Sequence, residues 1–86
     1  MWRVYVPTKL RKDLRRRFPV NAREAILAAL RDLERDGIHA AGVGYLMRDE
    51  YRWTGGPGRN YRILFRVPNT PTAWRAVSVL AYGPRP

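Results

Sequence analysis

The sequence predicts an α+β domain with the order strand, helix, helix, strand, strand, strand. Three segments, residues 2–6, 50–54 and 61–67, alternate as half-buried strands do, and residues 73–82 are predicted to form a long final strand. After the first of them, apolar residues recur every three or four positions, which predicts two amphipathic helices. With 86 residues the chain allows one domain, residues 1–86, and we expect a helix hairpin packed on a small, curved antiparallel sheet.

The first strand and first helix are predicted from local composition. Residues 2–6 are rich in β-formers, and Pro7 ends that strand. Thr8 is a candidate N-cap for a helix over residues 9–17, which Pro19 stops. The expected buried stripe of this helix repeats every four residues: Leu10, Leu14 and Phe18.

The second helix is predicted to start at Asn21 and to end at Gly37. Asn21 is a candidate N-cap, and Glu24 follows at the spacing of a capping box. Gly37 is a natural C-cap. The expected apolar face is Ile26, Leu27, Leu30 and Leu33. The short break between the helices predicts an antiparallel hairpin.

The second half of the chain predicts a three-stranded meander. Residues 38–47 are ambiguous and suggest a loop that leads into a strand, and residues 50–54 alternate as a strand. The stretch "GGPGRN" over residues 55–60 indicates a turn before the strand 61–67. In that strand one face should lie under the helices: Tyr61, Ile63, Phe65 and Val67. The other face then carries Arg62, Leu64 and Arg66.

Composition excludes several classes of protein. The chain has no cysteine, so it forms no disulfide and no thiolate metal site, and its one histidine, His39, excludes a multi-histidine cluster. The longest apolar runs are far shorter than a membrane span, and the N-terminus meets Pro7 and charge too soon for a signal peptide. We therefore expect a cytoplasmic protein that needs no cofactor.

The charge predicts a polyanionic partner. Seventeen Lys and Arg against seven Asp and Glu give a net charge of +10. Such a field attracts nucleic acid, an anionic membrane or an acidic protein, and arginine suits phosphate contacts. A GC-rich genome would explain arginine in place of lysine, but not the shortage of acids. The run "KLRKDLRRR" is either a solvated helix face or a surface that contacts RNA phosphates through Lys9, Lys12 and Arg16.

Three motifs carry a resemblance to a known family. They are "DEYRW" at residues 49–53, "YRILFRV" at residues 61–67 and "VSVLAYGPR" at residues 77–85. Their order and spacing, after a basic helix pair, resemble the RelE/ParE superfamily of toxins from type II toxin–antitoxin systems. The resemblance extends over nearly the whole chain and implies the RelE/ParE-like fold.

The resemblance implies one of two activities. RelE-like toxins are endoribonucleases that cut messenger RNA on the ribosome, where the 2′-hydroxyl attacks the adjacent phosphodiester without a metal. ParE-like toxins poison DNA gyrase. In both branches an antitoxin binds the toxin through its C-terminal segment, so we expect a partner with an acidic or amphipathic segment. The third alternative is a non-enzymatic RNA-binding module.

The resemblance also assigns roles to individual residues. Arg62 matches the central arginine of the family and would clamp the scissile phosphate and stabilise the transition state. Arg85 would be a second clamp, and Arg52 falls where RelE enzymes carry a lysine. Arg52 and Arg59 would contact flanking phosphates. The further RNA-binding candidates are Arg66, Arg48, Lys9, Lys12 and Arg16.

The proton-transfer groups stay open because the sequence departs from the family. The tyrosine or histidine of the usual C-terminal extension is missing, Pro84 replaces a frequent lysine, and Thr54 replaces a second basic residue. The substitutes are Tyr82, placed with the catalytic residues, and His39, Asp49 and Glu50. Without the resemblance, Arg62 and Arg66 would equally be the solvent side of an amphipathic strand.

Overall fold

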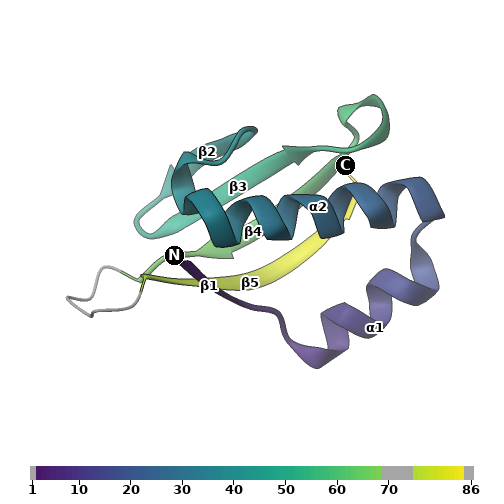
Figure 1. The fold of residues 1–86 in the computed structure, drawn as a ribbon, viewed down its shortest axis with the longest axis horizontal. Coiled ribbons are helices and arrows are strands. Elements are labelled where there is room, and N and C mark those ends of the chain that lie inside the picture. Colours follow the sequence, from purple (N-terminus) through teal and green to yellow (C-terminus); the bar gives the residue numbers. More distant parts are fainter. Residues whose placement is uncertain (1, 69–74, 85–86) are drawn as a thin grey trace.

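The computed structural model describes residues 2–68 and 75–84, and it forms one sheet with two helices on one of its faces (Figure 1). The elements in chain order are β1 (Trp2–Tyr5), α1 (Thr8–Arg17), α2 (Val20–Asp36), the 3₁₀ turn η1 (Gly37–His39), β2 (Val43–Met47), β3 (Glu50–Gly55), the 3₁₀ turn η2 (Pro57–Arg59), β4 (Tyr61–Arg66) and β5 (Arg75–Pro84). The predicted fold class and order of elements are confirmed, with one strand more than expected and with a mixed sheet in place of the antiparallel sheet predicted.

The sheet is mixed, with the strand order β1-β5-β4-β3-β2. Strands β2 to β5 form an antiparallel meander, and β1 pairs with β5 in parallel. The extra strand is β2, which lies in the ambiguous segment 38–47. A tight turn at Arg48, whose φ is 48°, returns the chain so that β2 pairs with β3. Gly42 and Gly44 weaken the strand signal of this segment in the sequence, because glycine is a poor strand former.

Both N-caps precede the predicted ones, by one residue in α1 and by two residues in α2. Pro7 and Pro19 occupy the N-cap positions, and no side chain caps either helix. The predictions for Thr8 and Asn21 were therefore wrong: Thr8 is the first residue of α1, and the side-chain oxygen of Asn21 accepts the N–H of Ala22 at 2.9 Å inside the first turn of α2.

The predicted C-cap at Gly37 is confirmed. Its φ of 57° lies in the region that favours glycine, and its N–H donates to the carbonyl of Leu33. A Cβ at Gly37 would lie 2.0 Å from the indole ring of Trp2, so only glycine fits at this point. The end of α2 is thereby packed directly on β1.

The core lies between the helices and the sheet. Its largest fully buried side chains are Phe65, Ile26, Leu33, Ile63 and Val77. Tyr61 and Val67 pack against this core, which confirms the inward face predicted for β4, and Trp53 is 8% exposed. Leu27 differs from the prediction: it is 40% exposed although it belongs to the expected apolar face of α2.

The predicted stripe of α1 packs inward, with Leu14 buried and Leu10 and Phe18 partly buried. The turn at Phe18 and Pro19 folds α1 back beneath α2 (Figure 1). Neither of these two helices is long and apolar enough to cross a membrane.

Candidate nucleic-acid interface

Two predicted arginines lie close together on the face of the sheet away from the helices. Arg52 lies on β3 and Arg62 on β4, and Arg62 is paired in register with Thr54, two residues beyond Arg52. Residues two apart on a strand share a face, so Arg52 and Arg62 are diagonal neighbours, with Cα atoms about 7–8 Å apart. Two guanidinium groups on neighbouring strands of one rigid sheet can approach the same phosphate.

Each of these arginines is paired with a glycine on the adjacent strand that lies away from the other arginine. Gly83 of β5 is paired with Arg62, and Gly44 of β2 is paired with Arg52. A Cβ built on either glycine would meet nothing within 4 Å, and neither has a positive φ, so neither packing nor backbone conformation requires glycine here. Because the two glycines have no side chains, no atoms project from the sheet beside Arg52 and Arg62, which leaves room for a phosphate to approach closely.

Arg59 adds a third guanidinium at the edge of this surface. It lies in η2, between β3 and β4, with a φ of 56°. Arg59, Arg52 and Thr54 line a hollow of about 290 Å³, which residues 42–46 close from the side of β2. The predicted site residues Arg52, Arg59 and Arg62 are thus brought to one part of the sheet. We call these three the arginine face.

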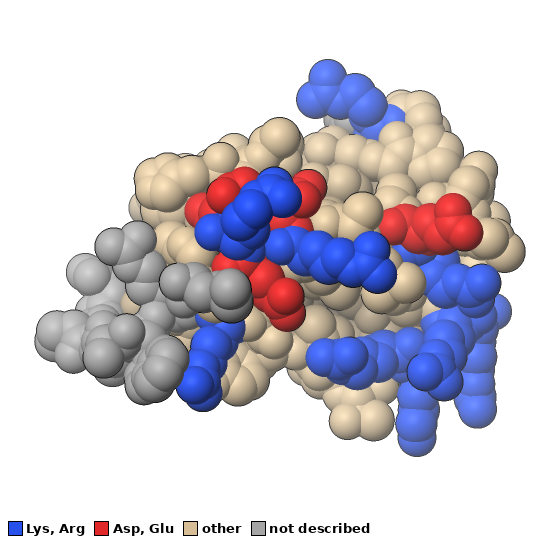
Figure 2. All heavy atoms as spheres, in the orientation of Figure 1, with Lys and Arg blue, Asp and Glu red and all other residues tan. Residues whose placement is uncertain are grey.

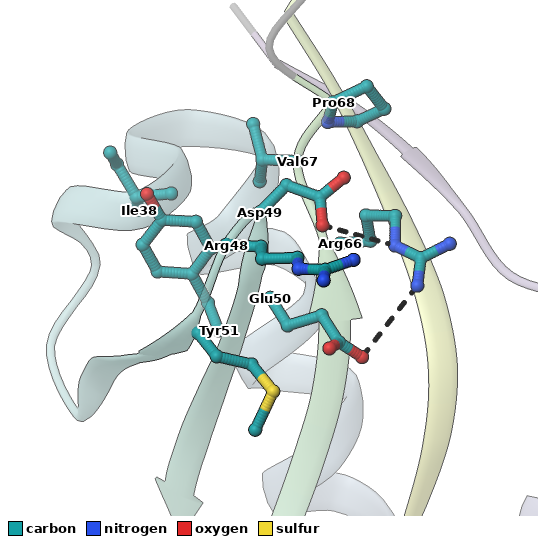
Figure 3. Close-up of a pocket in the computed structure, with 9 residues that line it drawn as sticks. Ile38, Arg48, Asp49, Glu50, Tyr51, Arg66, Val67 and Pro68 are labelled. Atoms are coloured by element: carbon teal, nitrogen blue, oxygen red, sulfur yellow. Dashed lines mark ion pairs between the residues drawn. The ribbon is translucent and has the colours of Figure 1, made fainter.

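Arg66 lies at the other end of β4 and is paired with acids. Its Nε atom is 3.4 Å from a carboxylate oxygen of Asp49, and one of its terminal nitrogens is 3.8 Å from Glu50 (Figure 3). The three residues line a broad pocket of about 990 Å³ at the turn between β2 and β3. In contrast, no carboxylate within residues 2–68 and 75–84 forms an ion pair with Arg52 or Arg62. The two arginines of "YRILFRV" therefore differ in their local charge.

The remaining RNA-binding candidates lie elsewhere. Lys9, Lys12 and Arg16 are exposed on α1, where Lys and Arg side chains gather (Figure 2). Arg48 is exposed in the turn between β2 and β3 and lines the same pocket as Arg66. The three residues of α1 are separate from the arginine face because α1 belongs to the helix layer, and Arg48 lies at the end of the sheet where Arg66 is found.

Tyr82 faces the helices and not the arginine face. A β-bulge between β4 and β5 shifts the register, so that Tyr82 is paired with the inward-facing Ile63. Its hydroxyl donates to the carbonyl of Leu10, and its ring packs edge-on against Phe18. Burial raises the pKa of Tyr82 to about 12.

The other proton-transfer candidates have different surroundings, and Glu50 shares the face of Arg52, two residues before it on β3. Asp49 and Glu50 are engaged with Arg66, and His39 is exposed in η1 at the end of α2. Arg85 lies outside the residues that the structure describes. Among the described residues, no three His, Asp or Glu side chains gather as metal ligands. The arginine face therefore offers positive charge and an open surface for a phosphate, and the catalytic and RNA-binding roles of its residues stay predictions.

Sequence reasoning missed the two glycines beside the arginines. Gly44 and Gly83 interrupt strands, and an unexplained glycine in a strand is a recognised sign of close approach by another molecule. The sequence alone does not show which residue each glycine faces, and the strand register is needed to place Gly83 beside Arg62.

Comparison with known proteins identifies the fold. Searches of the sequence against family models and curated proteins give no match. Among solved structures, a chain of the toxin–antitoxin complex RelBE2 from Mycobacterium tuberculosis is similar, with a TM-score of 0.72, 23% sequence identity and 98% of each chain covered. The E. coli toxin RelE, as a mutant in the free state, has a TM-score of 0.66 and 19% identity over 96% of this chain and 82% of that one. The chain therefore has a RelE-like fold.

Proposed function

We propose that this protein is the toxin of a toxin–antitoxin system and that it is a metal-independent endoribonuclease that cleaves messenger RNA on the ribosome. One observation carries the proposal: Arg52 and Arg62 are diagonal neighbours on an open sheet face, flanked by glycines and without a described acidic partner. The RelE-like fold supports it, because the two similar structures are those of a toxin–antitoxin complex and of a toxin.

In this proposal, the arginine face acts by positioning and by charge. The 2′-oxygen of a nucleotide attacks the adjacent phosphorus, the bond to the 5′-oxygen breaks, and negative charge accumulates on the equatorial phosphate oxygens. Arg62 binds those oxygens, and Arg52 binds the same phosphate from the neighbouring strand. Arg59 holds a flanking phosphate. Preorganised donors of this kind contribute because they need no rearrangement as the charge develops.

The proposal also includes partners and a location. An antitoxin with an acidic or amphipathic segment neutralises the protein, and messenger RNA and ribosomal RNA are its targets in the cytoplasm. The exposed cations of α1 contact ribosomal phosphates without reading sequence. Tyr82 has no catalytic role in this scheme, because its hydroxyl is engaged with the carbonyl of Leu10.

The test is to induce the protein in a bacterial host and to map the 5′ ends of messenger RNA, with Arg62→Gln and Arg35→Gln in parallel. Arg35 is an exposed arginine of α2 that is paired with Asp32 and Asp36, so its replacement removes the same unit of charge far from the arginine face. New ends inside reading frames that persist in Arg35→Gln and disappear in Arg62→Gln are expected. Ends that are unchanged in Arg62→Gln would remove Arg62 from the mechanism.

A gyrase poison of the ParE type is the second candidate, and the position of Tyr82 favours it. With Tyr82 turned toward the helices, the tyrosine that was predicted to act with the catalytic arginines is engaged with the carbonyl of Leu10. In the same induction experiment, DNA damage with intact messages would support this candidate. Normal growth with intact messages would support a non-enzymatic RNA-binding module.

A further inference from the structure

A row of aromatic rings leads from the core to the outer edge of the sheet. Phe65 of β4 is fully buried, and the ring of Tyr51 on β3 stacks on it with a centroid distance of 5.8 Å. Tyr45 on β2 meets Tyr51 in an edge-to-face contact at 5.5 Å. Because β2 is the last strand of the sheet, the row ends at Tyr45, which is 63% exposed. The buried end of the row thereby anchors an exposed ring.

The exposed surface of β2 is apolar. Leu46 and Met47 are exposed together with Tyr45, so three consecutive large apolar side chains face solvent at one edge of the sheet. Strand β2 itself contains no charged residue. Natural sheets usually protect an exposed edge with charged side chains or proline. An edge that lacks both and carries an anchored ring indicates a surface that another molecule covers.

The backbone of β2 is a poor template for an added strand. Between Tyr45 and Met47 its register with β3 shifts, as at a β-bulge. A bulge bends the strand and interrupts the regular spacing of its backbone donors and acceptors, which opposes edge-to-edge pairing. The net charge of +10 also opposes the approach of a second copy of this chain. These two features favour a negatively charged partner that binds the side chains of β2 and not its backbone.

Arg48 places a positive charge at the end of β2. It is exposed in the turn to β3 and forms no ion pair among the residues that the structure describes, whereas Arg66 in the same pocket is paired with both neighbouring acids (Figure 3). The φ of Arg48 is 48°, a conformation that glycine adopts at lower cost. The turn therefore does not explain an arginine at this position, and a guanidinium group beside an exposed ring suits a phosphate.

We propose that Tyr45 stacks on an unpaired base of the RNA strand that the arginine face holds, with Arg48 on an adjacent phosphate; the inference rests on the proposed function. Arg62, Arg52 and Gly44 lie on the successive strands β4, β3 and β2, and Tyr45 follows Gly44 at the outer edge. Gly44 has no side chain to block an RNA strand that crosses from Arg52 to this edge. Tyrosine rings beside arginines bind unpaired bases without regard to sequence, because every base has a π-face.

Stacking on Tyr45 has two signatures that phosphate contacts do not share. In a duplex the bases are already stacked on one another, so Tyr45 gains nothing there, while the phosphates remain available to the arginines. A stacked base also makes no ionic contact, so the affinity lost with the ring should be the same at every salt concentration. Preference for unpaired RNA and an unchanged salt slope therefore separate Tyr45 from the arginine face.

The test compares an unstructured labelled RNA with a duplex of the same number of phosphates, by fluorescence anisotropy at several salt concentrations. Tyr45→Leu keeps an apolar side chain and removes the ring, and Tyr45→Phe keeps the ring. The matched control is Tyr5→Leu, because Tyr5 lies on β1 at the opposite edge of the sheet, is 54% exposed and has no ring contact in the described part of the chain. A fluorescent purine analogue in the unstructured RNA reports stacking directly, since its emission falls when it stacks.

We expect Tyr45→Leu to bind the unstructured RNA about tenfold more weakly, with an unchanged salt slope, and to bind the duplex as the unchanged protein does. Tyr45→Phe and Tyr5→Leu should bind both RNAs normally, and the stacking signal should disappear in Tyr45→Leu alone. Equal weakening for both RNAs, or equal effects of Tyr45→Leu and Tyr5→Leu, would overturn the stacking role. Two RNA strands bound per protein at saturation would assign Tyr45 to a separate RNA and overturn the shared strand.

The outcomes also separate this inference from the proposed function. Ring-dependent binding of unpaired RNA by a protein that does not cleave messages would uphold the stacking role and reject the nuclease. Message cleavage by a protein whose RNA binding is unchanged in Tyr45→Leu would uphold the nuclease and reject the stacking role.

Discussion

Replacing Arg62 by glutamine is expected to flatten the salt dependence of RNA binding by one phosphate contact. For single-stranded RNA, each contact contributes about −0.7 to the slope of log affinity against log salt. Between about 50 and about 200 mM salt, a fourfold range, one contact therefore accounts for about 2.6-fold in affinity. The unchanged protein should lose about 2.6 times more affinity over this range than Arg62→Gln does.

Arg66 on the same strand provides the sharpest control. Its charge is paired with Asp49 and Glu50, whereas Arg62 has no such partner in the described residues. Arg66→Gln alone would leave two carboxylates facing the RNA, so the control is the double variant Arg66→Gln/Glu50→Gln, which keeps the net charge. This double variant should retain the slope of the unchanged protein.

The assay is fluorescence anisotropy of a short labelled RNA titrated with protein at several salt concentrations. Arg35→Gln is measured beside the other variants because it lowers the net charge by the same unit as Arg62→Gln. If Arg35→Gln or the double variant flattened the slope as much as Arg62→Gln, the effect would come from total charge. The assignment of a phosphate contact to Arg62 would then be refuted.

Two further predictions test the neighbours of the arginine face. Gly83→Leu should weaken RNA binding about tenfold by blocking the approach to Arg62, as loss of a well-placed charge-assisted contact does. The control is Ser78→Leu, because Ser78 lies on β5 as Gly83 does but is paired with Arg66, and the thermal midpoint should change no more in Gly83→Leu than in this control. Equal effects of both leucines on RNA binding would contradict the prediction. The pKa of Tyr82 is raised to about 12, so the folded state holds its proton at a pH where the unfolded state has lost it, and stability should fall as the pH rises from about 10 to about 12. After allowance for solvent screening of a partly exposed ring, the free energy of unfolding should fall by about 1 kcal/mol more in the unchanged protein than in Tyr82→Phe, as measured by urea unfolding. If the two proteins lost stability equally with pH, the hydroxyl would be as exposed as in the unfolded chain.

Much of the fold was predictable because local patterns and tertiary packing agree. In β4, the alternation of "YRILFRV" assigned Ile63 and Phe65 to the core, and both are fully buried. The end of α2 was predictable at Gly37 because a positive φ has a strong preference for glycine. The helix starts were missed because Pro7 and Pro19, one residue before Thr8 and two before Asn21, already occupy the cap positions.

The strand β2 and the orientation of Tyr82 could not be predicted from local sequence. Strand β2 exists because β3 offers it a free edge, which is a property of the assembled sheet. Strict alternation in β5 would place Tyr82 opposite to Val77 and Val79, on the arginine face. The bulge between β4 and β5 adds one residue, and a one-residue shift reverses the face of every later side chain.

The same shift has a consequence for the candidate site. It turns Tyr82 toward Leu10 of α1, and it turns the next residue, Gly83, toward Arg62. A regular strand would have put a tyrosine ring near the arginine pair and the glycine beneath the helices. The bulge therefore leaves open space beside Arg62, where a regular strand would place a phenol ring. We expect such a site to act through charge and shape more than through proton transfer.

The two arginines of "YRILFRV" can now be given different physical roles. Arg66 neutralises Asp49 and Glu50 beside the turn between β2 and β3, where two adjacent carboxylates would otherwise repel RNA. Arg62, two rows farther along the sheet, keeps its charge available beside Gly83. Along the outer face of the sheet, the charge of Arg66 is neutralised by Asp49 and Glu50, whereas the charges of Arg62 and Arg52 have no such partner among the described residues. The phosphates of a bound polyanion should therefore lie at Arg62 and Arg52. The leucine between the two arginines, Leu64, is paired with Arg52 and Ala81, and its apolar side chain separates Arg62 from Arg66 along β4.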